Sequence, residues 1–169
     1  SDVCSSDLSI DVEKSSETVP QAGQGNNSDK DDNLGKGDAD TKATAVKLDD
    51  KVQTINFRVT NNGTEPLSHI KVTDKTIDGK QDVKNIKWVY QGKALTINKD
   101  GEFELDGKLL ELPVDGYVEA TGTLDKLDGG ETHADEATVS GKGAISGKTV
   151  GDKDEWYGEK PKAPDTPKP

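Results

Sequence analysis

The sequence predicts an all-β protein in which two antiparallel sheets pack face to face. Segments that alternate apolar and polar residues recur about every 8–15 residues, as strands with one buried face require. Turn-forming Gly, Asn and Asp residues separate these segments. The chain has 18 glycines and 7 prolines, and each would cost roughly 1–3 kcal/mol inside a helix. We therefore expect about seven strands and no helix of useful length.

The first predicted strand is short, and a long polar segment follows it. Ser9–Lys14 alternates, with Ile10 and Val12 on one face. Ser15–Lys42 is rich in Gly, Asn, Ser and Asp and has little to bury. We interpret it as a long first loop, and loops of this length usually carry a function or are flexible.

Two central segments show the clearest alternation. Residues 53–62 (QTINFRVTNN) end in the turn signal NNGTEP, and residues 67–74 (LSHIKVTD) repeat the pattern. This arrangement predicts a hairpin, with His69 on its exposed face. The apolar positions are Ile55, Phe57 and Val59 in the first segment, and Ile70 and Val72 in the second.

The remaining strands follow in the second half of the chain. Residues 83–97 predict two short strands around Gln91-Gly92. Residues 101–112 predict a hairpin that turns at Asp106-Gly107, because Asp-Gly adopts the positive φ angles of a tight turn cheaply. Residues 116–125, 132–143 and 145–152 supply three more strands.

The aromatic residues have structural interpretations. Ile86, Trp88 and Tyr90 share one face, so Trp88 is predicted to be the core tryptophan, with a sugar-stacking platform as the alternative. Trp156 and Tyr157 precede a proline-rich tail and are expected to cap the end of the domain or its junction with a neighbour.

The pattern favours a β-sandwich with immunoglobulin-like topology and a long first loop over residues 9–158. An up-and-down barrel is the alternative, and the uneven strand lengths and the long first loop speak against it. The tail Glu159–Pro169 alternates proline with charge and predicts an extended linker.

The first eight residues, SDVCSSDL, do not fit the rest of the chain. They hold the only cysteine, Cys4, with no His or second Cys near it to make a reactive thiol. Read back into codons, the segment resembles a short-read sequencing adapter translated in frame. We exclude residues 1–8 from the fold, which changes the net charge from −11 to −9 because Asp2 and Asp7 are removed.

Composition excludes several classes of function. A net charge of −11 argues against binding to nucleic acid or to an anionic membrane surface. No segment approaches the roughly 20 apolar residues of a membrane span, and no secretory leader is visible. His69 and His133 lie far apart in the sequence and in no nucleophile or metal motif, so we do not expect an enzyme.

One stretch carries a family resemblance. Residues 59–79, VTNNGTEPLSHIKVTDKTIDG, resemble the conserved-repeat immunoglobulin-like domains of Gram-positive surface proteins. The matching positions are Asn61, Gly63, Pro66, Leu67, Val72, Thr73 and Asp74. The Glu136–Val139 segment resembles the family's closing T-A-T-V strand, but Asp135 stands where such families often carry Asn. In physical terms, Asn61-Asn62-Gly63 can turn in left-handed conformations, and Asp74 at a strand end can accept backbone amides.

The resemblance implies a structural stalk or spacer unit of a cell-wall-anchored, adhesin-like protein on the cell surface. Its partners would be neighbouring repeats of the same chain, and we expect a monomer. The alternative is a module that binds a host glycoprotein or a carbohydrate, with or without calcium, through the Ser15–Lys42 loop or an aromatic face.

Two sites of chemistry are candidates. Some Gram-positive immunoglobulin-like domains form an amide between a first-strand Lys and a late-strand Asn or Asp, beside a buried acid. Here Lys14, Asp135 and Glu119 could form such a trio, with surface salt bridges as the alternative.

The second candidate is a calcium site in the long loop, with a solvated polar loop as the alternative. Carboxylate and amide oxygens are the ligands that calcium takes. The acidic residues are Asp29, Asp31, Asp32, Asp38 and Asp40, to which Asp152 and Asp154 could be added. No other cofactor is expected.

Overall fold

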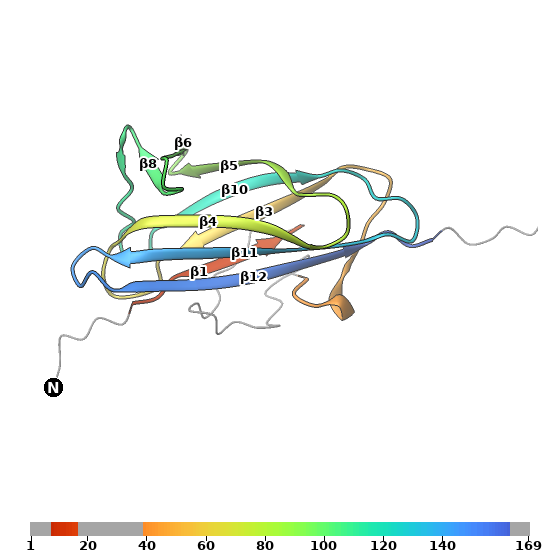
Figure 1. Cartoon of the computed structure of the whole chain (residues 1–169), viewed down its shortest axis with the longest axis horizontal. Helices are drawn as coiled ribbons and strands as arrows, with labels where there is room; N and C mark the ends of the chain where they lie inside the picture. Colours follow the sequence, from red (N-terminus) through yellow and green to blue (C-terminus); the bar gives the residue numbers. More distant parts are fainter. Residues whose placement is uncertain (1–7, 17–38, 163–169) are drawn as a thin grey trace, which may run out of the picture.

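The computed structural model describes residues 8–16 and 39–162. These residues form two sheets packed face to face, with a small third sheet at one end (Figure 1). The β-sandwich expected from the alternation is therefore confirmed. In the described residues, no helix is long or apolar enough to span a membrane.

The first sheet has the strand order β1-β3-β10-β5-β6 and is antiparallel throughout. Its strands span Asp11–Ser15, Gln53–Thr60, Tyr117–Leu124, Lys84–Tyr90 and Lys93–Ala94. The second sheet has the order β2-β12-β11-β4, and only the β2–β12 pair is parallel. Its strands span Val46–Lys47, Thr149–Glu159, Thr132–Gly143 and Leu67–Asp78.

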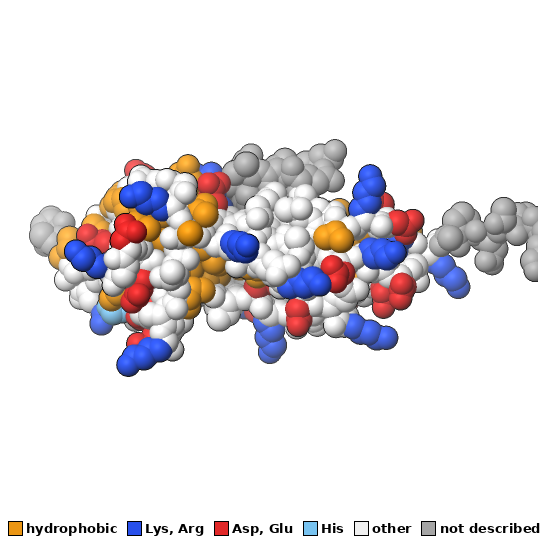
Figure 2. All heavy atoms as spheres, turned by 90° about the horizontal axis from the view of Figure 1, so that it is seen from above, with side chains coloured by type: hydrophobic (Ala, Val, Ile, Leu, Met, Phe, Trp, Pro, Cys, Tyr) orange, Lys and Arg blue, Asp and Glu red, His pale blue; other side chains and the backbone are white. Residues whose placement is uncertain are grey.

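The small sheet contains β7 (Thr96–Ile97), β8 (Phe103–Leu105) and β9 (Lys108–Leu109), and one turn of 3-10 helix spans Lys42–Thr44. The β8–β9 turn falls at Asp106-Gly107, with φ angles of 53° and 82°, as the sequence predicts. Hydrophobic side chains gather on the surface at this end of the molecule (Figure 2). Ile97 and Leu109 of the small sheet are among the exposed apolar residues.

The core fills the space between the two main sheets with the apolar faces that the alternation marks. Trp88 packs between Phe57 and Phe103, with ring centroids 5.8 and 5.2 Å away. Trp88 is only 8% exposed, so its interpretation as the core tryptophan is confirmed.

Several local expectations were wrong. Residues 53–62 and 67–74 do not pair as a hairpin, because β3 and β4 lie in different sheets. Of the three described residues Asn61, Asn62 and Gly63, none has a positive φ. Instead the Asn61 side chain holds the crossing by donating to the carbonyls of Glu65 and Leu112, at 2.9 and 3.0 Å.

The last strand is also longer than predicted. β12 runs to Glu159, and Trp156, three residues before its end, is fully buried. Leu8, which we assigned to the excluded segment, is half-buried and packs against the core. Residues 1–7, which include Cys4, lie outside the described part of the chain.

The first and last strands run side by side and in the same direction (Figure 1). The amides of Val12 and Lys14 donate to the carboxylates of Asp152 and Asp154, both at 2.8 Å, so the two strands advance together. These carboxylates occupy the free edge of β1 and join the first sheet to the second. β1 begins toward one end of the long axis, and β12 ends toward the other (Figure 1).

Candidate functional site

A lysine is buried in the interior of the sandwich. Lys14 takes the next inward position in the alternation of Ile10 and Val12, and its side chain is 0% exposed. Phe57 lies opposite it on β3, and the Lys14 Nζ atom is 5.6 Å from the centre of the Phe57 ring. A buried ammonium is costly unless other groups compensate its charge.

Two carboxyl groups provide that compensation. Lys14 Nζ contacts Asp135 Oδ2 directly and lies 3.1 Å from Asp74 Oδ1. It also donates to the Asp135 backbone carbonyl at 2.8 Å. The side chains of Asp135 and Asp74 are 0% and 6% exposed, so little of the cluster reaches solvent.

The second sheet places the two acids beside each other. Asp135 lies on β11 opposite Thr76 of β4, and Asp74 pairs with Ala137 two residues further along β11. Asp74 and Asp135 therefore share the inward face of adjacent strands, and their carboxyl groups hydrogen-bond to each other. Lys14 reaches them from β1, so three strands of both sheets meet at this cluster.

The surroundings shift the pKa values of the three buried groups in different directions. Burial would raise the pKa of Asp135, but the Lys14 charge and the hydrogen bonds from His133, Asp74 and Lys14 hold that pKa well below its usual range. Burial also opposes the charge on Lys14, yet the two aspartates outweigh it and keep the pKa of Lys14 raised. Burial and the neighbouring Asp135 raise the pKa of Asp74 to about 7, against the lowering effect of Lys14.

With Asp74 protonated, the buried trio has no net charge. It consists of an ammonium, a carboxylate and a carboxylic acid in mutual contact. Moving one proton from Lys14 Nζ to Asp135 Oδ2 gives an amine, two acids and no charges. The raised pKa of Lys14 and the lowered pKa of Asp135 make the charged pair the resting state, and burial narrows the gap to the neutral form because it penalises each charge.

The sequence-predicted trio is brought together only in part. Lys14 and Asp135 meet as the amide hypothesis requires. Glu119 of β10 lies elsewhere, lining the hollows on the outer face of the first sheet beside Lys87 and Thr121. The acid beside the pair is Asp74, which the sequence suggested only as a turn residue.

A histidine also belongs to the cluster. The Nε2 atom of His133 lies 2.8 Å from Asp135 Oδ1, and both side chains are 0% exposed. Its position two residues before Asp135 on a strand puts both side chains on one face, a signal present in the sequence. His69, in contrast, is 42% exposed and pairs with Glu102 at 2.9 Å.

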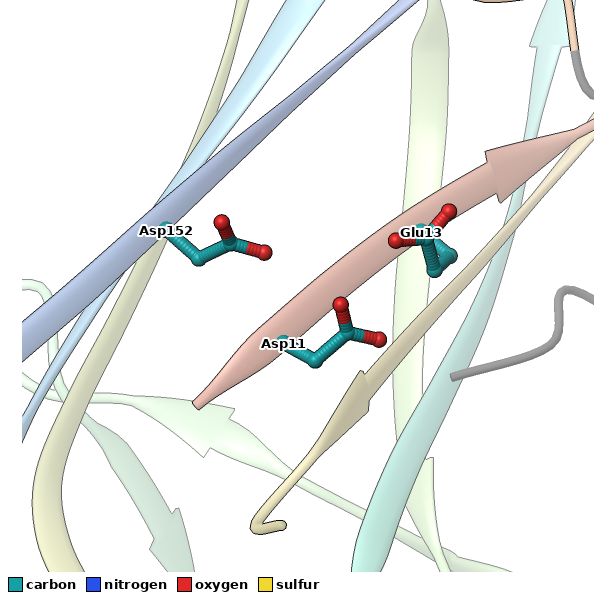
Figure 3. A group of neighbouring side chains, drawn as sticks. All are labelled: Asp11, Glu13 and Asp152. Atoms are coloured by element: carbon teal, nitrogen blue, oxygen red, sulfur yellow. The ribbon is translucent and has the colours of Figure 1, made fainter. Parts of the chain in front are cut away.

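A separate acidic group lies further along β1 and β12. Asp11 and Glu13 of β1 and Asp152 of β12 each bring a carboxylate oxygen within 4.8 Å of the others, and all three are buried (Figure 3). Asp152 already accepts the Val12 amide. Of the proposed calcium residues, Asp29, Asp31, Asp32 and Asp38 lie outside the described residues, Asp40 is buried, and Asp154 accepts the Lys14 amide.

No family model and no curated protein matches the chain. Among solved structures it is similar to the PapD-like domain 7 of human CEP192, at 10% identity and a TM-score of 0.43, over 94% of this chain and 89% of that one. It is also similar to BslA, a bacterial hydrophobin (13%, 0.44, 92% and 97%). The CooA pilin subunit of enterotoxigenic Escherichia coli is another (13%, 0.39, 90% and 98%). Likenesses this weak carry no information on function.

Proposed function

We propose that this chain is a structural spacer module of a Gram-positive, cell-wall-anchored surface protein. We further propose that an amide bond between Lys14 and Asp135 secures it. The observation that carries the proposal is the fully buried contact between the Lys14 amine and the Asp135 carboxyl, with the Asp74 carboxyl beside both. Such a contact holds two reacting groups at close range in a water-poor site.

The bond would form by loss of one water. A proton first moves from Lys14 Nζ to Asp135 Oδ2, and the free amine then adds to the Asp135 carboxyl carbon. Asp74 gives its proton to the departing oxygen and takes one proton back from the nitrogen. The products are one amide and one water, and Asp74 ends protonated as it began.

The direction of β1 and β12 supports a load-bearing role. These strands carry the described ends of the chain to opposite ends of the sandwich (Figure 1). A pull along that axis therefore loads β1 against its neighbours in shear. An amide from Lys14 to Asp135 would pass the force directly from β1 to β11 and would leave residues 15–134 outside the loaded path.

Intact mass tests the bond. The purified chain is expected to weigh one water less than its sequence, and digestion should yield a branched peptide joining Lys14 to Asp135. The K14R variant should show the full mass, because a guanidinium stays protonated and is not a nucleophile. A wild-type chain of full mass would contradict the cross-link.

The gene around this segment tests the spacer role. Tandem copies of VTNNGxxPL, followed by a wall-sorting signal, are expected. A single copy beside a leader would contradict the spacer role, whatever the mass experiment shows.

A second candidate function is binding of a carbohydrate or host glycoprotein. It is favoured by a hollow between the β5–β6 turn and the loop before β10, lined by Tyr90, Tyr117 and Asp115. Tyrosine rings beside polar groups suit sugar recognition. Screening the chain and its Y117A variant against a glycan array, with and without calcium, tests this function. Binding lost in the variant would support it.

A further inference from the structure

His133 belongs to the buried cluster but has no role in the amide reaction described above. Its side chain is fully buried, and its ring packs beside Trp156 with centroids 6.0 Å apart. The ring presents Nε2 to Asp135 Oδ1 at 2.8 Å. This geometry places an imidazole nitrogen directly on a reacting group.

The hydrogen bonds of His133 assign its proton. Within the described residues, Nδ1 is buried and has no hydrogen-bond partner. A proton on Nδ1 would be a buried, unpaired donor, which costs about 1–3 kcal/mol. A proton on Nε2 instead bonds to the Asp135 carboxylate. The neutral ring with Nε2–H therefore satisfies the site best, and His133 acts as a donor without carrying charge.

The two oxygens of Asp135 consequently have different surroundings. Oδ1 faces His133, whereas Oδ2 faces Lys14 Nζ. Oδ2 is thus the oxygen that receives the lysine proton and departs as water. Oδ1 stays on the carbon and becomes the amide oxygen.

We propose that His133 is a catalytic residue of this reaction, whose Nε2–H stabilises the negative charge that develops on Asp135 Oδ1. The proposal rests on the proposed function, since it concerns the same bond. When the Lys14 amine adds to the carboxyl carbon, the electron pair of the C=O bond moves onto Oδ1. When water leaves, that pair returns to re-form the C=O bond. The donor is preorganised and meets the same oxygen as acid, as tetrahedral intermediate and as amide.

The test follows bond formation in time. Wild-type chain and variants are released from cell-free synthesis, quenched at intervals, and weighed for the loss of one water. H133L places an apolar side chain of similar bulk at this position and has no hydrogen-bond donor. H133Q can place an amide N–H near the Nε2 position. H69L removes the other histidine, which contacts Glu102 far from the cluster, and is the matched control.

H133L is expected to form the bond about 10²–10³-fold more slowly than wild type, H133Q within about tenfold of wild type, and H69L at the wild-type rate. H133L reacting at the wild-type rate would overturn the role of His133, and so would H133Q being as slow as H133L. A wild-type chain that never loses water would overturn the proposed cross-link itself, and the role of His133 with it.

A second measurement is independent of the folding of H133L. In the K14R variant, which should stay uncross-linked, ¹⁵N NMR of the imidazole reports which nitrogen carries the proton. We expect the proton on Nε2. A ring with its proton on Nδ1 would have no donor for Oδ1 and would overturn the proposal.

Discussion

Two lysine–aspartate pairs in this protein make the same contact in opposite surroundings. Lys84 Nζ lies 2.6 Å from Asp125 Oδ2 at the surface, where the two side chains are 52% and 47% exposed. Lys14 contacts Asp135 where both are 0% exposed. Water screens the first pair and solvates either partner alone, so that pair contributes little. Around Lys14 and Asp135 there is no water to replace a lost partner. The neutral form of this pair, an amine beside a carboxylic acid, is the form that could condense to an amide. Burial, more than proximity, distinguishes the surface salt bridge from the pair for which we propose a reaction.

The largest expected effect comes from D135A. It removes the proposed cross-link, which would close a loop of about 120 residues and, by analogy with a disulfide, would stabilise by about 5 kcal/mol. It also leaves a buried lysine without its main partner, at a further cost of about 3–5 kcal/mol. Denaturant unfolding measures the sum.

The double variant K14M/D135L separates these two costs, because it lacks the amide but buries no unpaired charge. We expect it to lose only the cross-link contribution. A double variant as unstable as D135A would show that apolar replacement does not relieve the site.

The second effect distinguishes Asp74 from Glu119. D74A removes the proposed proton shuttle but keeps the Lys14–Asp135 pair, so bond formation should slow by about 10²–10⁴-fold. E119Q changes an acid on the outer face of the first sheet and should react like wild type. The time course of water loss measures both rates. A slow E119Q variant beside a D74A variant that reacts like wild type would assign the proton shuttle to Glu119.

The third effect is a pH dependence. The pKa of Asp74 is raised to about 7, so this residue keeps its proton below that pH and loses it above. Because the departing oxygen needs that proton, the rate of cross-linking should fall as the pH rises through about 7. Water loss timed from about pH 5 to about pH 9 checks this. A rate that climbs above neutral pH would mean that Asp74 acts as a carboxylate.

The fourth effect concerns the edge of β1. D154A removes the acceptor of the Lys14 amide and should cost about 1.5–3 kcal/mol, as for a buried hydrogen bond to a charged group. Thermal unfolding of D154A in the K14R background measures this cost without the cross-link. An unchanged melting temperature would show that the Asp154 contact does not help to hold β1.

The smallest effect is expected at the surface pair. K84M should change the free energy of unfolding by no more than about 1 kcal/mol, because the pair is exposed and screened. Denaturant unfolding at low and high salt checks it. A loss comparable to that of D135A would contradict the distinction between the two pairs.

Much of the fold could be predicted because strand alternation and turn chemistry are local signals. The Asp106-Gly107 turn and the limits of β11 appear in the structure as expected. The pairing of β3 and the length of β12 could not be predicted in this way. Which strands become neighbours depends on how the sheets pack, and residues 150–159 alternate too weakly to reveal a buried strand.

The candidate site was predictable to a similar degree. Lys14 follows Ile10 and Val12 at an inward position, and His133 precedes Asp135 by two, so both could be assigned to a buried face from the sequence. Asp74 could not be placed, because its role depends on β4 lying next to β11.

The sequence by itself determined the all-β class and the turn at Asp106-Gly107, and only its resemblance to Gram-positive immunoglobulin-like domains singled out Lys14 and Asp135. Alternation and residue chemistry act over a few positions and need no knowledge of the fold. The tertiary structure alone decided that Asp74 and His133 complete the cluster and that Glu119 lies on the outer face. Residues from β1, β4 and β11 are distant in the chain, and only the packing of two sheets brings their side chains into one dry site.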